Sequence, residues 1–288
     1  MKNHQLSSIT STILVLALAL VLAFAAVSCG SEKEEIGKIG VVVSILPLAE
    51  FVDNIGGENV DASVMVPPGA SPHTYEPSPS QLVAVSKAKV FVKAGSGVQF
   101  ELTWMDKIID INSSMLVIDS SKRVMIMGND PHIWLSPLNA KIMVENICDG
   151  LIAADPENES YYVQNRDEYL RQLDELDDEI RENLDGVENR VFMVFHPAWG
   201  YFARAYGLEQ IAIEIEGKEP SAKDIANLIE EALERNIKVV FASPQFNQQS
   251  ARTIADEIGG IVVSIDPLAK DYITNMHTVL GYLVQELK

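Results

Sequence analysis

The sequence predicts an α/β protein made of two similar lobes, each a mostly parallel sheet flanked by helices, with one long rigid helix joining them. From Ile36 onward, short apolar runs alternate with helical patterns. Several runs are nearly continuous Val, Ile and Phe, which is typical of parallel strands covered by helices on both faces. The 288 residues are enough for two lobes of ordinary domain size.

The candidate strands fall into two groups along the chain. In the first half they are Ile39–Ile45, Ala62–Val66, Val90–Ala94 and Leu116–Ile118. In the second half they are Val191–Phe195, Gln210–Ile213, Val239–Ala242 and Ile261–Ile265. No solenoid-type repeat is visible, and we expect the two halves to be similar lobes.

A long helical segment separates the two groups. Asp155 can cap it, Pro156 suits its first position and Gly186 suits its end. Residues 158–185 contain no Gly or Pro, and a stripe at helical spacing is formed by Leu173, Leu176, Ile180 and Leu184. About 28 residues would span about 40 Å. The predicted parts are therefore a first lobe at 36–154, a rigid linker helix at 155–186 and a second lobe at 187–288. A second helix start is predicted at Ser221, with Asp224 as its acidic partner.

The N-terminus has the pattern of a targeting segment. Lys2 precedes an apolar run at 13–27, whose length suits a signal peptide better than a membrane span of about 20 residues. The run ends in small residues before Cys29, which resembles a bacterial lipobox. We therefore expect a signal peptide at 1–28, a lipid on Cys29 and a polar tether over 29–35. An uncleaved anchor helix is the alternative, and both place the folded part outside the cytoplasmic membrane.

Composition argues against nucleic-acid binding. The formal net charge of -19 leaves no basic footprint for phosphates. With Cys29 lipidated, Cys148 stands alone, so no intrachain disulfide is expected; its apolar surroundings favour a buried structural thiol.

Three histidines and one aspartate stand where ligands gather in α/β proteins. His73 and His132 lie in proline-rich turns, and His196 follows a predicted strand directly. Asp266 also ends a strand and precedes a proline. Because ligands bind outside the carboxyl ends of parallel strands, these side chains could converge in a cleft, two from each lobe. His277 has no candidate partners nearby and is interpreted as structural.

Three imidazoles and a carboxylate suit Zn²⁺ in near-tetrahedral geometry. Ca²⁺ and Mg²⁺ prefer oxygen ligands throughout, whereas Mn²⁺ accepts mixed nitrogen and oxygen ligands. Zinc is therefore the predicted ion and manganese the alternative. A zinc hydrolase with three histidines and Glu76 as general base is the rival function, but Asp266 would fill its open position and no catalytic string is present.

The chain resembles the metal-binding receptors, or solute-binding lipoproteins, of zinc and manganese ABC importers, whose lobes are joined by a rigid helix. The resemblance covers nearly the whole mature chain and rests on PPGASPHTYEPSPSQ, DPHIWLSP, FHPAWGYFARAYGL, EGKEPSAKDIANLIE and IDPL. It implies a non-enzymatic receptor whose metal ligands are His73, His132, His196 and Asp266. A histidine at the third position is the zinc-associated choice in this family.

The resemblance also implies partners and a location. The expected partners are the permease and ATPase of an ABC importer, and the expected location is the outer face of the cell membrane through the lipid on Cys29, with the protein a monomer. The His-rich loop of many zinc members is absent from the stretch 122–129. A surface adhesin is a further alternative that no residue supports. Around the ligands, Glu76 could orient a histidine, and Trp134 and Trp199 could exclude water.

Overall fold

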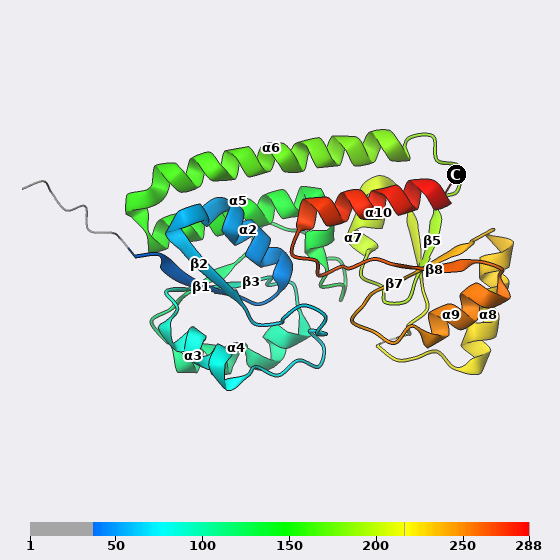
Figure 1. The fold of residues 1–288 in the computed structure, drawn as a ribbon, viewed down its shortest axis with the longest axis horizontal. Coiled ribbons are helices and arrows are strands. Elements are labelled where there is room, and N and C mark those ends of the chain that lie inside the picture. The colour runs from blue at the N-terminus through cyan, green and yellow to red at the C-terminus, as the bar shows by residue number, and fades with distance from the viewer. Residues whose placement is uncertain (1–36, 216, 288) are drawn as a thin grey trace, which may run out of the picture. The chain divides into compact units, whose positions relative to one another are not determined.

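Two four-stranded parallel sheets form the framework of the protein (Figure 1). The computed structural model describes residues 37–215 and 217–287. The first sheet has the order β2-β1-β3-β4, from β1 (Ile39–Val43), β2 (Val60–Val64), β3 (Val90–Lys93) and β4 (Leu116–Asp119). The second has the order β6-β5-β7-β8, from β5 (Val191–Val194), β6 (Glu209–Ala212), β7 (Val239–Ala242) and β8 (Ile261–Ser264). The shared strand order confirms the predicted pair of similar lobes.

Helices cover both faces of each sheet. In the first lobe they are α2 (Leu46–Gly56), α3 (Pro79–Lys87), α4 (Gln99–Ile111) and α5 (Pro137–Ala154). In the second they are α7 (Gly200–Tyr206), α8 (Ala222–Glu234), α9 (Gln249–Glu257) and α10 (Tyr272–Glu286). Short 3₁₀ turns are η1 (Gly57–Asn59), η2 (Ile133–Leu135) and η3 (Pro156–Asn158). Ser221 caps α8 in a capping box with Asp224, which confirms the predicted helix start.

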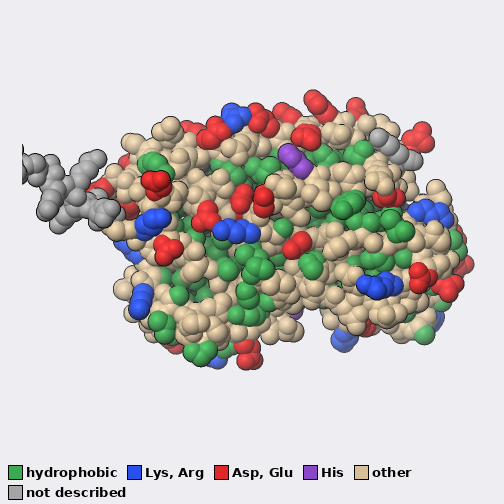
Figure 2. Space-filling model, viewed as in Figure 1, with side chains coloured by type: hydrophobic (Ala, Val, Ile, Leu, Met, Phe, Trp, Pro, Cys, Tyr) green, Lys and Arg blue, Asp and Glu red, His purple; other side chains and the backbone are tan. Residues whose placement is uncertain are grey.

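The long helix α6 (Glu159–Leu184) contacts both lobes. It packs against α2 and α5 of the first lobe and against α7 and α10 of the second, and Figure 1 shows it running past both. Its 26 residues span about 39 Å, and the predicted stripe of Leu173, Leu176, Ile180 and Leu184 is buried. The helix therefore lies along both lobes as expected, and acidic side chains gather on the face above it (Figure 2).

The start of this helical segment agrees with the prediction in position but not in its cap. Pro156 opens the segment, first as the 3₁₀ turn η3 and then as α6, while the Asp155 side chain makes no capping bond. The Asp155 carboxylate instead accepts hydrogen bonds from Asn158 Nδ2 at 2.8 Å and from Tyr162 Oη at 2.6 Å. It thus ties the end of α5 to the first turn of α6.

The larger hydrophobic core runs through both lobes. It contains the inner residues of the first sheet, the buried stripe of α6 and one face of the second sheet, including Phe192 and Phe241. The opposite face of the second sheet, with Met193 and Val240, forms a smaller core beneath α8 and α9. Because interiors are close-packed, wide separation of the lobes would open the larger core. The packing favours small adjustments between the lobes.

Trp134 fastens the lobes directly. Its indole Nε1 donates to the carbonyl of Pro267 at 2.7 Å, and its own carbonyl accepts from Tyr272 Oη at 2.8 Å. Trp134 is 1% exposed, so both bonds lie in a buried environment. A residue of the first lobe thereby fixes the segment between β8 and α10.

A carboxyl group with a raised pKa lies close to the segment between β8 and α10. Burial and the nearby Asp271 raise the pKa of Glu50 in α2 to about 7. An ion pair joins the neighbouring Asp53 and Lys270 at 2.7 Å. Since the folded protein binds the Glu50 proton more tightly than the unfolded chain, stability falls as the pH rises from about 4.5 through 7.

Glu50→Gln is therefore expected to raise the free energy of unfolding at pH 8 by about 1–2 kcal/mol, after allowance for solvent screening. Urea unfolding at pH 5 and pH 8 measures it, and the gain should be smaller at pH 5. Glu58→Gln, at an exposed position just after α2, is the control. An equal gain at both pH values would contradict ionisation of Glu50 as the cause.

The predicted signal peptide, Cys29 and tether lie outside the described residues. Within 37–215 and 217–287, none of the helices combines the length and apolar character needed to span a membrane.

Candidate metal centre

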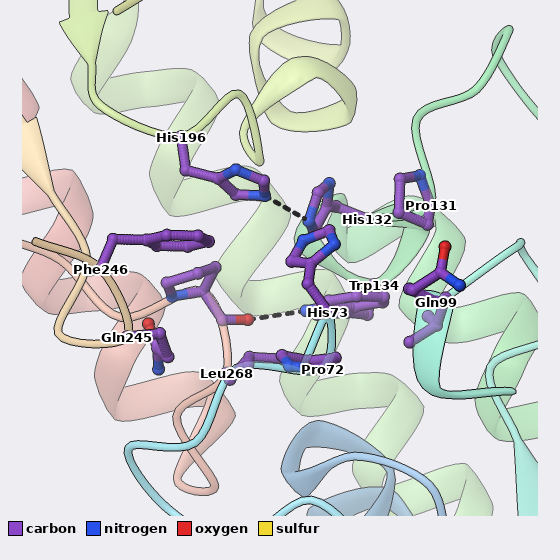
Figure 3. A pocket seen from close by; sticks show the side chains of 12 residues that line it. Pro72, His73, Gln99, Pro131, His132, Trp134, His196, Gln245, Phe246 and Leu268 are labelled. Atoms are coloured by element: carbon purple, nitrogen blue, oxygen red, sulfur yellow. Dashed lines mark hydrogen bonds between the residues drawn. The ribbon is translucent and has the colours of Figure 1, made fainter. Parts of the chain in front are cut away.

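Loops at the carboxyl ends of the strands bring three histidines together. His73 follows β2, His132 follows β4 and His196 follows β5. The ring centroids of His132 and His196 are 5.1 Å apart, and those of His73 and His196 are 5.2 Å apart. Figure 3 shows the three rings gathered around one pocket. The first lobe supplies two of these rings and the second lobe supplies the third.

The spacing of two ring nitrogens fits a shared ion. Nε2 of His132 and Nε2 of His196 are 3.3 Å apart. Two nitrogens that bind one tetrahedral zinc at about 2.0–2.1 Å stand roughly 3.3–3.4 Å from each other. Both side chains are largely buried, each residue being 8% exposed. The pair from opposite lobes is therefore already spaced as a zinc ion requires.

Carboxylates hold the far side of both rings. Asp130 Oδ1 lies 2.7 Å from His132 Nδ1, and Glu214 Oε2 lies 2.8 Å from His196 Nδ1. A neutral imidazole that donates Nδ1–H to a carboxylate turns the lone pair of Nε2 toward a metal and becomes a stronger ligand. Gly200 permits this arrangement, because a Cβ there would stand 2.6 Å from Asp130 Oδ2.

Desolvation lowers the pKa of two of the rings, which favours their neutral form. Desolvation lowers the pKa of His132, although Asp130 opposes this effect. Desolvation and the neighbouring His196 lower the pKa of His73, which is itself exposed on its loop. Histidines must be neutral to bind a metal, so these pKa shifts favour binding at neutral pH.

A buried acid supports the turn that carries His132. Glu101 accepts hydrogen bonds from Ser44 Oγ at 2.5 Å and from the backbone N–H groups of Ala94 and Gly95. This fixes the loop after β3, from which Ser96 Oγ donates to the carbonyl of Pro131 at 2.5 Å. The residue before His132 is therefore held by the loop that follows the neighbouring strand β3.

The pocket itself is small and largely apolar. Its volume is about 20 Å³, enough for about one water-sized particle. Its wall is formed by Pro72, Val98, Gln99, Pro131, Trp134, Gln245, Phe246, Pro267 and Leu268 beside the three histidines. Phe246 stacks on His196 with ring centroids 4.5 Å apart. Such a site suits a single ion.

Asp266 lies next to this wall. Its Oδ1 accepts hydrogen bonds from Gln245 Nε2 at 2.7 Å and from the Leu268 N–H at 2.8 Å. Asp266 is not among the residues that line the pocket. In the described part of the chain, no three His, Cys, Asp or Glu side chains already form a complete metal-holding group. The role of Asp266 as a metal ligand stays a prediction.

The other predicted side chains lie at different distances from the centre. Trp134 lines the pocket and meets His132 edge-on, with centroids 5.4 Å apart. Trp199 is buried against Phe202, outside the pocket lining. Glu76 is exposed, and among the described residues it makes no hydrogen bond with His73. His277 is exposed on α10, 3.5 Å from Glu179.

Comparison with known proteins identifies the family. The model described as "ZnuA: Zinc-uptake complex component A periplasmic" matches residues 41–286. The chain belongs to this family. Membership confirms the resemblance predicted from the histidine motifs.

The relatives of this ZnuA-family chain include zinc and manganese proteins. It is 29% identical to the high-affinity zinc uptake system protein ZnuA of Bacillus subtilis (strain 168), covering 88% of this chain and 86% of the relative. It is 30% identical to the manganese-binding lipoprotein MntA of Halalkalibacterium halodurans, covering 83% and 84%. It is 28% identical to the zinc-binding lipoprotein AdcA of Streptococcus pneumoniae (strain R6), covering 88% of this chain but only 54% of that longer relative.

Solved structures agree with the fold. The crystal structure of a ZnuA is 41% identical, with a TM-score of 0.85 over 87% of this chain and 100% of the other. The predicted architecture is thereby confirmed.

Family membership also defines the kind of activity. This ZnuA-family chain is a receptor for zinc or manganese in an ABC uptake system, and it is a periplasmic or extracellular binding protein, not an enzyme. The hydrolase alternative is set aside for that reason.

Proposed function

We propose that this receptor binds Zn²⁺ through His73, His132, His196 and Asp266 and delivers it to the permease of an ABC importer. The observation that supports this best is the Nε2 pair of His132 and His196, 3.3 Å apart, with a carboxylate behind each ring. Two first-lobe and two second-lobe ligands would close the site between the lobes.

Zinc is favoured over manganese by the donor set. Three imidazole nitrogens and one carboxylate oxygen complete a tetrahedral shell, which Zn²⁺ accepts and which Mn²⁺ fills less well. The zinc uptake protein of Bacillus subtilis is among the relatives, and the manganese-binding lipoprotein MntA keeps Mn²⁺ as the alternative cargo.

The division of the chain suggests how the ion is released. In this proposal the lobes are residues 36–154 and 187–288, with residues 155–186 as the strut. Because the strut and the shared core limit wide opening, docking on the permease needs only to separate the histidine pair slightly. The signal peptide 1–28 and the lipid on Cys29 would keep the receptor, as a monomer, at the membrane beside the permease and its ATPase.

Isothermal titration with Zn²⁺ between pH 5 and pH 8 tests the assignment. Protons compete with the ion, so affinity is lost as the pH falls through the histidine pKa values. Since those of His73 and His132 are lowered, affinity should be nearly constant from pH 8 to 7. Below about pH 6 it should fall steeply, by about tenfold per pH unit for each protonated ligand. A flat profile down to pH 5 would exclude the histidines as ligands.

A further inference from the structure

The loop between β7 and α9 carries a glutamine that joins Asp266 to the pocket. Gln245 Nε2 donates to Asp266 Oδ1 at 2.7 Å, and the Leu268 N–H donates to the same oxygen at 2.8 Å. This loop follows β7, and His196 follows β5. Because β5 and β7 are neighbours in the second sheet, the loop begins close to His196. Gln245 thus lies at the switch point where ligands bind in such sheets.

The other end of the same amide has no partner. Gln245 Oε1 is buried and accepts no hydrogen bond from the described residues. Buried acceptors of this kind are rare in native proteins, because water has been removed without replacement. The bond to Asp266 fixes Nε2, and with it the orientation of the whole amide.

The residue also faces the right space. Gln245 lines the pocket together with all three histidines, whereas Asp266 does not. In Figure 3, Gln245 and Phe246 lie on one side of the pocket, with Gln99 and Pro131 on the other and the histidines between them. A pocket of about 20 Å³ has room for about one water-sized particle, so an oxygen in its wall lies close to any ion bound there.

We propose that Gln245 Oε1 is an additional oxygen donor to the bound cation and a determinant of metal selectivity. The inference rests on the proposed metal site. Zn²⁺ is satisfied by four ligands, whereas Mn²⁺ favours more oxygen donors and higher coordination. A neutral fifth donor therefore contributes more to Mn²⁺ binding than to Zn²⁺ binding, and it accounts for a site that can accept either ion.

Chelator competition with purified protein measures the dissociation constants of both ions for four proteins. These are the wild type, Gln245→Leu, Gln245→Glu and the control Gln249→Leu, which makes the same change at an exposed position in the same region. Gln245→Leu should weaken Mn²⁺ binding by about tenfold and Zn²⁺ binding by less than about threefold. Gln245→Glu retains an oxygen and should keep the ratio of the two constants within about threefold of the wild type. The control should leave both constants unchanged.

Three results would overturn the inference. No weakening of either ion's binding in Gln245→Leu would show that Oε1 does not meet the cation. Equal weakening of the binding of both ions would show that it does not determine selectivity. If Gln245→Leu and Gln245→Glu weaken Mn²⁺ binding relative to Zn²⁺ binding by the same factor, the effect belongs to the hydrogen bond from Gln245 Nε2 to Asp266. If Gln245→Leu does not fold, as judged by circular dichroism, Gln245→Met takes its place, because it has similar length and also lacks the amide oxygen. A wild type that binds neither ion would instead refute the proposed function, and this inference with it.

Discussion

His132→Ala is expected to abolish high-affinity zinc binding, with a loss of at least about 1000-fold, or about 4 kcal/mol. The reason is the geometry of its ring, whose Nε2 lies 3.3 Å from His196 Nε2 while Asp130 holds Nδ1. Alanine removes one of four ligands and leaves a buried opening that no neighbouring donor fills. The two lobes would then no longer be joined through the ion.

Thermal unfolding with and without Zn²⁺ provides the measurement. At a free zinc concentration about 1000 times the dissociation constant, the wild type gains about 4.1 kcal/mol, which for a protein of this size raises Tm by roughly 8–16 °C. His132→Ala should show almost none of this rise. His277→Ala, an exposed histidine on α10, is the matched control and should retain it.

The melting curve without zinc distinguishes a general loss of stability in His132→Ala from the loss of a zinc ligand. Loss of His132 leaves the Asp130 carboxylate without its ring partner, which lowers Tm in both the presence and the absence of zinc. Only the zinc-dependent rise reports on the ligand role. A wild-type rise in His132→Ala would remove this histidine from the site.

The positions of the three histidines could be predicted because they depend on backbone topology. Each follows an apolar strand or lies in a proline-rich turn, and parallel strands bring their carboxyl ends to one edge. The sequence shows strand ends and stiff turns directly. The helical segment opens at Pro156 as predicted, but its first three residues form a 3₁₀ turn, and the Asp155 side chain bonds to Tyr162 without capping it.

The groups that orient the histidines were harder to find because they depend on side-chain rotamers. Asp130 precedes His132 by two residues, a spacing that offered a signal for its contact. Glu214 is 18 residues from His196 and reaches it because β6 and β5 are neighbours in the sheet. Strand order would have indicated this pair, whereas composition and periodicity do not. Glu76 was chosen for its nearness to His73 in sequence, and its carboxylate is exposed.

Glu214→Gln should weaken zinc binding by about 10–100-fold. The Glu214 carboxylate is buried and lies 2.8 Å from His196 Nδ1, where it fixes the ring orientation and strengthens Nε2 as a donor. Glutamine keeps the size of the side chain but removes the negative charge. The loss should therefore be smaller than that of a ligand and larger than that of a surface change.

Chelator competition at pH 7.5 measures this loss against Glu209→Gln, the same substitution at an exposed position of β6. Asp130→Asn tests the equivalent partner of His132 and should give a loss of similar size. Equal affinity in Glu214→Gln and Glu209→Gln would mean that the carboxylate only fills space beside His196. A loss confined to Glu214→Gln and Asp130→Asn would show that a carboxylate strengthens the ligand histidine in each lobe. Two separate loops would then contribute to the affinity for one ion in the same way.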